Sequence, residues 1–311
     1  MLLQELIQGL GLRVVVGKDQ QVVTEITDDS RAVTPGCLFI ARSGHKTDGH
    51  DYVIDAIKRG ATSVLTDGKL THTDSQIDAP VAWVQSDRPV DNALLALLAE
   101  RFFGHPSDKL KLVGVTGTNG KTTTVLIVQH LLAAAGVKAG IIGTIVIDDG
   151  ATRTESNLTT PGAIELSRIL AAMVRNGCTA AVMETSSHAL HQNRTGALRF
   201  AVAACTNLTG DHLDYHGTME HYAAAKALLF ERLSPDATAV VNAEDPWAAR
   251  MISGTSAKVL GCAIDQKQHA ISRQTGTKQA QALTQPQVRA TLRGLHAGSS
   301  DALFELSLIH I

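Results

Sequence analysis

The stretch from Leu112 to Thr124 constrains this chain more than any other part of its sequence. It begins with a short apolar run rich in β-branched residues, passes through Gly117 and Gly120, and continues into an apolar pattern with helical spacing, which predicts strand, loop and helix. Glycines let backbone N–H groups turn toward phosphate oxygens, and a helix N-terminus adds partial positive charge. Lys121 adds a full charge, and the Thr122 hydroxyl can bind Mg²⁺. The stretch therefore predicts a site for a nucleoside triphosphate.

The glycine spacing of this stretch departs from the generic phosphate-binding motif. That motif has a glycine five residues before Gly120, where this sequence has Val115, and its glycines stand at 114 and 117 instead. The structural alternative is a glycine-rich turn between a strand and a helix. Such a turn does not require Gly-Lys-Thr-Thr at the start of the helix, so the nucleotide site is the favoured interpretation.

The composition is that of an ordinary globular protein with small-molecule ligands. The 311 residues favour two domains, with 44% hydrophobic and 19% charged residues. Lysine plus arginine number 28 against 30 for aspartate plus glutamate, which gives no reason to expect nucleic acid as a partner. The four cysteines stand far apart and fit a reducing cytoplasm. Without a membrane-spanning run or a signal peptide, we expect a cytoplasmic monomer with no membrane insertion.

The order of patterns along the chain predicts a small domain followed by a larger one. Residues 1–86 predict an α/β domain with helices over 2–10 and 52–59 and strands over 37–41, 62–66 and 81–84. Residues 87–108 predict an apolar helix and a linker. From 109 onward, strands and helices alternate, which predicts a mostly parallel sheet with helices on both faces. We expect one strand over 139–147 and two paired strands over 288–292 and 302–306. Ligands of such sheets bind beyond the carboxyl ends of the strands.

Two polar segments lie where a ligand of such a sheet is expected. One precedes a predicted helix, and the other stands at the end of a predicted strand. In segment 157–162, Thr159 and Thr160 can donate hydroxyls to an anion, although the segment also suits a helix N-cap. In segment 181–188, an apolar strand ends on Glu184. A buried carboxylate requires a partner, and Mg²⁺ beside ATP suits a hard oxygen ligand, so we favour Glu184 as a metal ligand.

Three further features leave alternatives open. Segment 206–217 places two histidines and two aspartates within six residues, which suits either a polar loop or a metal site. Lys226 lies at helical spacing from Tyr222 and Phe230, so it either points inward or extends to solvent. Asn242 ends another strand, where it can bind an adenine edge and Asp245 a ribose hydroxyl, although Asp-Pro before a helix also suits a simple cap.

Taken together, these segments resemble the Mur ligases, and within that family the UDP-N-acetylmuramoyl-tripeptide synthetases of the MurE type. The resemblance covers the chain to about residue 262, and its most specific parts are 117–123, 183–188 and 207–217. The polar loops at 27–31 and 43–49 look like the UDP-sugar site of this family. The chain departs from the family pattern at Asp28, where the family frequently has an apolar residue, and at Ala189, where it frequently has glycine.

The resemblance implies a role for each matching residue. The UDP-N-acetylmuramoyl end would be held by Asp28, Ser30, His45, Lys46 and Thr47, and the peptide by Thr159, Thr160, Ser186, Gln192 and Arg194. ATP would be held by Gly117, Thr118, Asn119, Gly120, Lys121, Thr122 and Thr123, with Asn242 at the adenine. One Mg²⁺ would be bound by Thr122 and Glu184 and a second by His212. Lys226 matches a lysine that the family carbamylates, which turns a cation into an oxygen ligand. Lys121, Lys226 and His212 are thereby the expected catalytic residues.

The function implied by the resemblance belongs to peptidoglycan precursor synthesis. It is the ATP-dependent joining of a diamino acid, meso-diaminopimelate or L-lysine, to UDP-N-acetylmuramoyl-L-alanyl-D-glutamate through an acyl phosphate. The family continues into a C-terminal Rossmann-like domain, and we expect this sequence to stop before it. The central domain over 109–305 would then be incomplete, and 306–311 an artefactual tail that resembles a sequencing adapter. The alternative is an inert fragment that only binds UDP-sugar or nucleotide, and the variant loop disfavours a P-loop kinase.

Overall fold

The computed structural model describes residues 1–44, 48–67, 81–264 and 288–290, and divides the chain into two compact units. Unit 1 comprises Met1–Pro106, Gly162–Ala171 and Asn193–Leu198, and unit 2 comprises Ser107–Pro161, Ala172–Gln192 and Arg199–Ile311. Each unit is built on its own sheet. The division into 1–86, 87–108, 109–305 and 306–311 stays a prediction, because unit 1 also takes in two segments from later in the chain.

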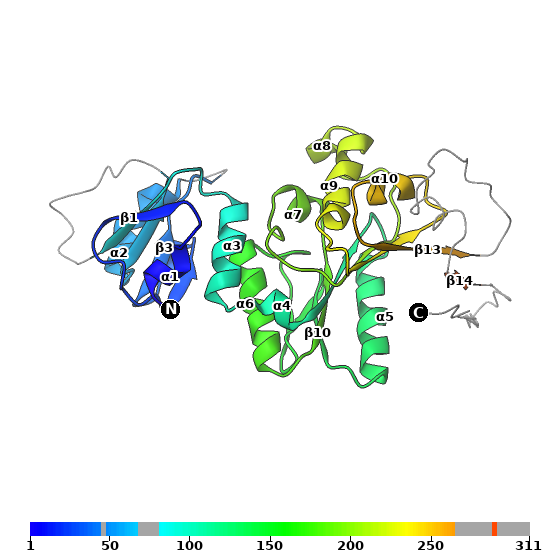
Figure 1. Cartoon of the computed structure of the whole chain (residues 1–311), viewed down its shortest axis with the longest axis horizontal. Coiled ribbons are helices and arrows are strands. Elements are labelled where there is room, and N and C mark those ends of the chain that lie inside the picture. Colours follow the sequence, from blue (N-terminus) through cyan, green and yellow to red (C-terminus); the bar gives the residue numbers. More distant parts are fainter. Residues whose placement is uncertain (45–47, 68–80, 265–287, 291–311) are drawn as a thin grey trace. The chain divides into compact units, whose positions relative to one another are not determined.

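Unit 1 is a five-stranded sheet with helices against it (Figure 1). Its strand order is β1-β5-β4-β3-β2, with β1 antiparallel to β5 and the other pairs parallel. The elements are α1 (Leu3–Ile7), β1 (Leu12–Val16), β2 (Glu25–Thr27), a 3₁₀ turn (Ser30–Ala32), β3 (Cys37–Ile40), a second 3₁₀ turn (Gly49–Tyr52), α2 (Val53–Lys58), β4 (Ser63–Thr66), β5 (Ala82–Ser86) and α3 (Asn92–Phe102).

The core of unit 1 follows from the alternation of side chains along its strands. Leu38, Ile40 and Leu65 face one apolar cluster together with α1, α3 and the start of α6 (Ala163–Arg175). Phe39 and Val64 face a second cluster, on the side of α2. Because successive strand residues point to opposite faces, this sheet is covered on both sides.

Unit 2 holds a nine-stranded sheet in the order β14-β13-β12-β11-β6-β10-β7-β8-β9, parallel from β14 to β7 and antiparallel at β8 and β9. Its elements are α4 (Pro106–Lys109), β6 (Lys111–Thr116), α5 (Lys121–Ala134), β7 (Ala139–Ile142), β8 (Val146–Asp148), β9 (Arg153–Glu155), β10 (Ala180–Glu184), α7 (Ser187–His191), β11 (Val202–Cys205), α8 (Leu213–His216), α9 (Met219–Glu231), β12 (Thr238–Asn242), α10 (Ala248–Ile252), β13 (Lys258–Ile264) and β14 (Val288–Ala290). The predicted fold class, with a mostly parallel sheet, is confirmed.

Helices cover both faces of the larger sheet. Val115 of β6 packs with Val125 of α5 on one face. The neighbouring Gly114 points the other way, where a Cβ would lie 3.2 Å from a methyl carbon of Leu229 in α9. Since adjacent strand residues point to opposite faces, α5 and α9 lie on opposite sides of the sheet.

The register of the central strands brings three of their carboxyl ends to one level. Glu184 at the end of β10 is paired with Val115 of β6, and Cys205 at the end of β11 is paired with Thr116. The loops after β6, β10 and β11 therefore leave the sheet side by side. This edge is where a doubly wound sheet binds ligands.

Several element bounds differ from the sequence expectations. The strand expected over 139–147 is wrong: it is a hairpin in which β7 ends at Ile142 and β8 begins at Val146, closed by a Gly143 N–H bond to the Val146 carbonyl at 3.0 Å. Both arms are apolar, so no change of pattern marks the turn. Helix α1 is shorter than the expected 2–10, and β1 and β2 were not predicted. β14 lies within the expected strand 288–292, and 302–306 falls outside the described residues.

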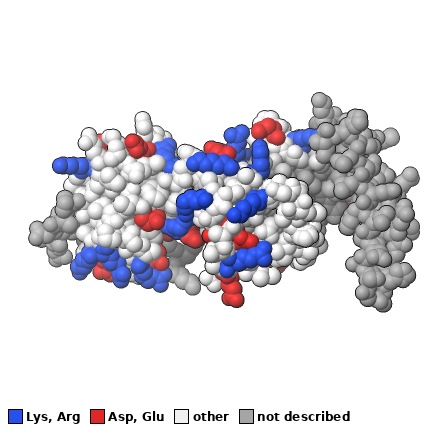
Figure 2. All heavy atoms as spheres, turned by 90° about the horizontal axis from the view of Figure 1, so that it is seen from below, with Lys and Arg blue, Asp and Glu red and all other residues white. Residues whose placement is uncertain are grey.

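The surface and the helices agree with the balanced composition. On the face drawn in Figure 2, lysine and arginine side chains are interspersed with aspartate and glutamate, and neither sign forms a continuous patch there. Within the described ranges, every helix is too short or too polar to cross a membrane.

Candidate nucleotide-binding site

The loop between β6 and α5 has backbone conformations that only glycine adopts readily. Gly117 has a φ of 135° and Gly120, which caps α5, has a φ of 82°. A Cβ at Gly117 would lie 2.0 Å from Oγ1 of Thr206, so any larger residue there would clash. The loop therefore has the two glycines where its turn and its contact with the next loop require them.

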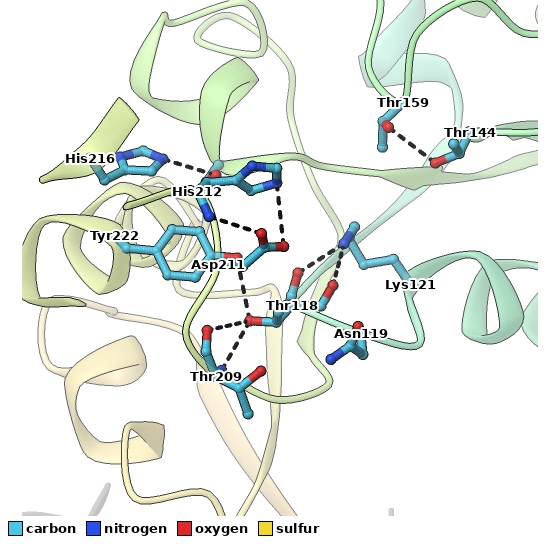
Figure 3. Close-up of polar contacts among 12 residues, drawn as sticks. Thr118, Asn119, Lys121, Thr144, Thr159, Thr209, Asp211, His212, His216 and Tyr222 are labelled. Carbon is cyan, nitrogen blue, oxygen red and sulfur yellow. Dashed lines mark hydrogen bonds and ion pairs between the residues drawn. The ribbon is translucent and has the colours of Figure 1, made fainter. Parts of the chain in front are cut away.

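The loop after β11 braces this phosphate-loop segment at several points, and Figure 3 shows the bonds between Thr118 and Thr209. Thr206 donates from Oγ1 to the Asn119 carbonyl at 2.6 Å, and the Asn119 N–H donates to the Asn207 side-chain oxygen at 3.0 Å. The Thr118 N–H donates to the Asn207 carbonyl at 2.8 Å. These bonds tie the backbone of the phosphate loop to the loop after β11.

Lys121 folds back onto the loop that precedes it. Its Nζ donates to the carbonyl oxygens of Gly117 at 3.0 Å and Thr118 at 2.8 Å (Figure 3). Burial lowers the pKa of Lys121, and the nearby carboxylates of Glu184 and Asp211 oppose that shift. The ammonium thus lies at the mouth of the loop, where a phosphate oxygen can replace the carbonyls as its acceptor.

Glu184 is a buried carboxylate held by neutral donors. It is 1% exposed, and its Oε1 accepts from the Thr122 hydroxyl at 2.9 Å and from the Thr144 N–H at 2.8 Å. Its Oε2 accepts from the Thr144 hydroxyl at 3.0 Å. No lysine, arginine or histidine forms a salt bridge with Glu184 among the residues that the structure describes. The structure therefore brings Thr122 and Glu184 together, as two hard oxygen ligands beside the phosphate loop.

Lys226 points inward from α9, which decides between the two alternatives that the sequence left open. It is 1% exposed, and its Nζ donates to the Gly117 carbonyl at 2.9 Å. The Nζ also lies 4.5 Å from the ring centre of Tyr222, one turn earlier on the helix. Burial, followed by the charge of Lys121, lowers the pKa of Lys226 to about 7. A buried amine with this pKa is neutral in an appreciable fraction of molecules near pH 7.

His212 belongs to a group of aromatic side chains from α7, α8 and α9. Its ring centre is 4.8 Å from that of His188, and its Nε2 is 3.5 Å from a carboxylate oxygen of Asp211. His216, 7% exposed, contacts the Ser187 hydroxyl at 3.0 Å, and burial and the other imidazoles lower its pKa to about 4. Within the described parts of the chain, no three His, Cys, Asp or Glu side chains are placed to hold a metal ion by themselves.

The expected peptide-binding residues lie around the end of β10, with one exception. The Thr160 hydroxyl donates to the Glu184 carbonyl at 2.9 Å and accepts from the Ser186 N–H at 3.0 Å. Thr159 and Thr144 have hydroxyl oxygens 3.1 Å apart. Gln192 donates to the Tyr215 hydroxyl at 3.2 Å, whereas Arg194 belongs to unit 1.

The expected UDP-sugar residues are described only in part. Asp28 forms an ion pair with Arg42 at 2.8 Å, and Ser30 begins the first 3₁₀ turn, which the Asp29 carboxylate caps. His45, Lys46 and Thr47 lie outside the described residues. At the end of β12 in unit 2, the Asn242 side-chain oxygen accepts from the Glu244 N–H at 3.0 Å. The roles assigned to these residues stay predictions.

Sequence reasoning missed two residues that shape the site. Thr144 holds both oxygens of Glu184, and the Tyr222 hydroxyl lies 3.3 Å from that of Thr118 in the phosphate loop. Thr144 was not considered as a site residue because it fell inside the single strand expected over 139–147. A Gly-Thr pair inside an apolar run was the only available signal, since glycine there often marks a turn.

The chain matches two family models over these units. The Mur ligase middle domain matches residues 115–297, and the model described as Mur ligase family, catalytic domain, matches residues 22–103. The chain belongs to the Mur ligase family, whose members are ATP-dependent amide ligases.

Its curated relatives include MurE-type ligases of peptidoglycan synthesis. It is similar to the UDP-N-acetylmuramoyl-L-alanyl-D-glutamate--2,6-diaminopimelate ligases of Cytophaga hutchinsonii and Chlorobaculum tepidum. The first is 42% identical over 260 residues, or 83% of this chain and 52% of that relative. The second is 45% identical over 242 residues, or 78% of this chain and 46% of that relative. The chain thus spans about half the length of the relatives it matches.

Solved structures agree with this family membership. A ligase with the same diaminopimelate name matches with a TM-score of 0.71 at 25% identity, covering 93% of this chain and 54% of the other. MurF from Acinetobacter baumannii matches with a TM-score of 0.60 at 20% identity, covering 93% of this chain and 54% of the other. The second match shows a shared fold alone.

Proposed function

We propose that this chain carries the nucleotide-binding and UDP-sugar-binding parts of a ligase of peptidoglycan precursor synthesis. The proposed reaction joins a diamino acid, meso-diaminopimelate or L-lysine, to UDP-N-acetylmuramoyl-L-alanyl-D-glutamate with ATP. The names of the curated relatives support the acceptor and favour diaminopimelate as the amino acid. ATP use is common to the family.

The observation that carries the proposal is the contact between Thr122 and Glu184. Thr122 lies in the first turn of α5, directly after the phosphate loop, and its hydroxyl reaches a carboxylate that ends a neighbouring strand. A glycine-rich turn with only a structural role has no need of a buried acid at this place. A buried carboxylate that only neutral donors contact directly is costly unless a cation binds it in the working protein.

The residues present fit Mg²⁺. Hydroxyl and carboxylate oxygens are its preferred protein ligands, and beside phosphates it takes only one or two of them. Thr122 and Glu184 would hold the first ion, and His212 with a carbamylated Lys226 would hold a second. When bound, the ions offset charge on the ATP phosphates and on the transferred phosphoryl group.

The buried amine of Lys226 suits modification by carbon dioxide. Its neutral nitrogen would attack the carbon of CO₂, forming an N–C bond, and one proton would leave to water. The lowered pKa supports this step, because the free amine is the reactive form. The product is an anionic carbamate in place of a cation, which also removes repulsion between Lys226 and Lys121.

The residues of the loop would bind and orient the nucleotide. Residues Gly117 to Thr123 would surround the phosphates, with N–H groups at the start of α5 and the ammonium of Lys121 as donors, and Asn242 would contact adenine. Asp28, Ser30 and residues 45–47 would hold the UDP-sugar end, and Thr159, Thr160, Ser186, Gln192 and Arg194 the peptide. Catalysis then rests on positioning and electrostatics.

The proposed ligase reaction has two steps, formation of an acyl phosphate and formation of the amide. A carboxylate oxygen of the D-glutamyl residue attacks the γ-phosphorus of ATP, and the bond to ADP breaks, which gives an acyl phosphate and ADP. The amine of the diamino acid then attacks the acyl carbon and loses a proton. The tetrahedral species that results expels inorganic phosphate and leaves the amide.

The nucleotide part is tested by calorimetric titration of the 311-residue chain with ADP, with Mg²⁺ and with EDTA. We expect binding in both conditions and tighter binding with Mg²⁺. Glu184→Gln removes the charge while it keeps the shape, and it should abolish the Mg²⁺ effect while binding in EDTA persists. Glu155→Gln, on the exposed strand β9, is the matched control. Absence of any nucleotide binding by the unmodified chain would contradict the proposal.

A second candidate function is binding without turnover. The match of this chain covers 52% and 46% of the two relatives, so turnover is the part of the proposal that a separate measurement has to establish. The measurement that separates the two is phosphate release from ATP with UDP-N-acetylmuramoyl-L-alanyl-D-glutamate and meso-diaminopimelate. Release that requires the amino acid supports ligase activity of this chain, and binding without release supports the second candidate.

A further inference from the structure

We propose that Thr144 is a positioning residue, which fixes the carboxylate of Glu184 for Mg²⁺ and connects it to Thr159 of the neighbouring loop. This inference rests on the proposed function, because it concerns how the first metal ligand is held. It adds a residue that neither the family resemblance nor the sequence pattern had indicated. Thr144 would not touch ATP or the ion; it would act through Glu184.

Thr144 restrains the Glu184 carboxylate more than Thr122 does, because it contacts both carboxylate oxygens. Thr122 reaches only Oε1. Thr144 reaches both oxygens, with its N–H at 2.8 Å from Oε1 and its hydroxyl at 3.0 Å from Oε2. Two donors from one residue on the two oxygens of one carboxylate stop its rotation about the last side-chain bond. Thr144 therefore sets the plane of the carboxylate.

The hairpin that carries Thr144 is shaped for this approach. Gly143 precedes it, and a Cβ there would lie 2.7 Å from Oε1 of Glu184. Only glycine lets the backbone come so close, and the next N–H then points at the carboxylate. The bond from the Gly143 N–H to the Val146 carbonyl closes the turn at 3.0 Å without help from the Thr144 side chain.

The Thr144 hydroxyl also links Glu184 to the segment that contains Thr159. The oxygens of Thr144 and Thr159 are 3.1 Å apart, and each hydroxyl has one proton to donate. The Thr144 hydroxyl is the donor in both contacts, to Oε2 of Glu184 at 3.0 Å and to Oγ1 of Thr159, and it shares its one proton in favour of the charged carboxylate, which is the stronger acceptor. The result is a chain of hydroxyls from the proposed peptide contact to the proposed metal ligand.

The position of Thr144 separates a positioning role from a structural one. Thr144 is an exposed residue, whereas Glu184 is 1% exposed. Replacement of an exposed threonine by valine leaves no cavity and keeps the β-branched shape. Thr144→Val removes the hydroxyl bond to Oε2 and keeps the backbone bond to Oε1, so the fold should survive while the carboxylate gains freedom.

The test compares nucleotide affinity with Mg²⁺ and in EDTA for four forms of the 311-residue chain. These are the unmodified chain, Thr144→Val, Thr144→Ser and the control Thr154→Val, which makes the same change on the exposed strand β9. The readout is the ratio of the two ADP dissociation constants, with the thermal unfolding midpoint measured alongside. Thr144→Val should lower the Mg²⁺ enhancement about tenfold and leave binding in EDTA unchanged.

The conservative variants sharpen the result. Thr144→Ser keeps the hydroxyl and should stay within about twofold of the unmodified chain, and Thr154→Val should match it. Equal Mg²⁺ enhancement in Thr144→Val and the unmodified chain overturns this inference alone. Loss of binding in both conditions with a lowered unfolding midpoint also overturns it, because Thr144 would then be structural. No nucleotide binding by the unmodified chain overturns the proposed function with it.

Discussion

Lys121 and Lys226 donate to the same oxygen, the carbonyl of Gly117, from two different regions of the molecule. Lys121 begins α5, is partly exposed, and has Glu184 and Asp211 as electrostatic neighbours. Lys226 lies in the middle of α9 and is 1% exposed, and the charge of Lys121 is the largest electrostatic effect on its pKa after burial. Burial lowers the pKa of both, but to about 7 only for Lys226.

The two lysines differ in chemistry because their surroundings differ, although they are the same residue type. A partly exposed lysine at a helix start, with two carboxylates near it, suits phosphate oxygens. A buried lysine beside a second cation loses its proton more readily and becomes a nucleophile toward CO₂. Four experiments break or sharpen this contrast.

The largest expected effect is on stability, and it comes from replacing Gly117, whose carbonyl accepts from both lysines. Gly117→Ala places a Cβ 2.0 Å from Thr206 Oγ1 at a φ of 135°, so strain and overpacking add to about 4 kcal/mol of lost stability. Urea unfolding measures it. Gly136→Ala is the control, since its φ is 76° but no atom lies within 4 Å of the new Cβ, and it should cost about 1 kcal/mol. An equal loss of unfolding free energy in the two variants would show that Thr206 does not exclude a side chain at position 117.

Removal of the first lysine should act on nucleotide binding and not on stability. Lys121→Met should weaken ADP affinity about 100-fold, because charge-assisted hydrogen bonds to phosphate are lost. Calorimetric titration measures the change, with Lys111→Met on the exposed first residue of β6 as the control. An affinity within threefold of the unmodified chain would remove Lys121 from the phosphate site.

Removal of the second lysine should act on the pH dependence of stability. Between the folded pKa of about 7 and the unfolded value of 10.5, the unfolded chain holds the Lys226 proton and the folded chain does not. Stability from this residue is therefore full above pH 10.5 and is lost as the pH falls toward 7.

The measurement compares unfolding free energies of the unmodified chain and Lys226→Met at pH 7.5 and 9.0 in CO₂-depleted buffer. The difference between the two chains should grow in favour of the unmodified chain by about 2 kcal/mol over this range. Lys111→Met should show no such growth. A flat difference for Lys226→Met would mean that Lys226 is protonated in the folded chain throughout.

The smallest expected effect on stability comes from the hydroxyl contact between Tyr222 of α9 and Thr118 of the phosphate loop. Tyr222→Phe keeps the ring beside Lys226 and removes the hydroxyl that lies 3.3 Å from Thr118, so it should cost about 1 kcal/mol of stability. Urea unfolding with the exposed Tyr52→Phe as control measures this. A change in the pH dependence of stability as large as that of Lys226→Met would mean that the hydroxyl, and not burial, governs Lys226.

The fold could be predicted where the signal lies in consecutive residues. The end of β10 at Glu184 was predicted correctly, because a central parallel strand is a continuous apolar run and the carboxylate marks its last residue. The hairpin of β7 and β8 could not, because its two arms are equally apolar and one residue pair makes the turn. The site divides in the same way: the phosphate loop is contiguous, whereas Thr144 reaches Glu184 across 40 positions of sequence.

The sequence by itself determined the strand, loop and helix around Gly117, the acid at the end of β10 and the membership of a ligase family. These depend on glycine conformations, apolar spacing and motifs, which are properties of neighbours along the chain. Only the tertiary structure decided that Lys226 is buried against the Gly117 carbonyl and that Thr144 holds both oxygens of Glu184. Burial and proximity depend on the register of strands that are far apart in sequence, and it is burial that sets the pKa of a lysine.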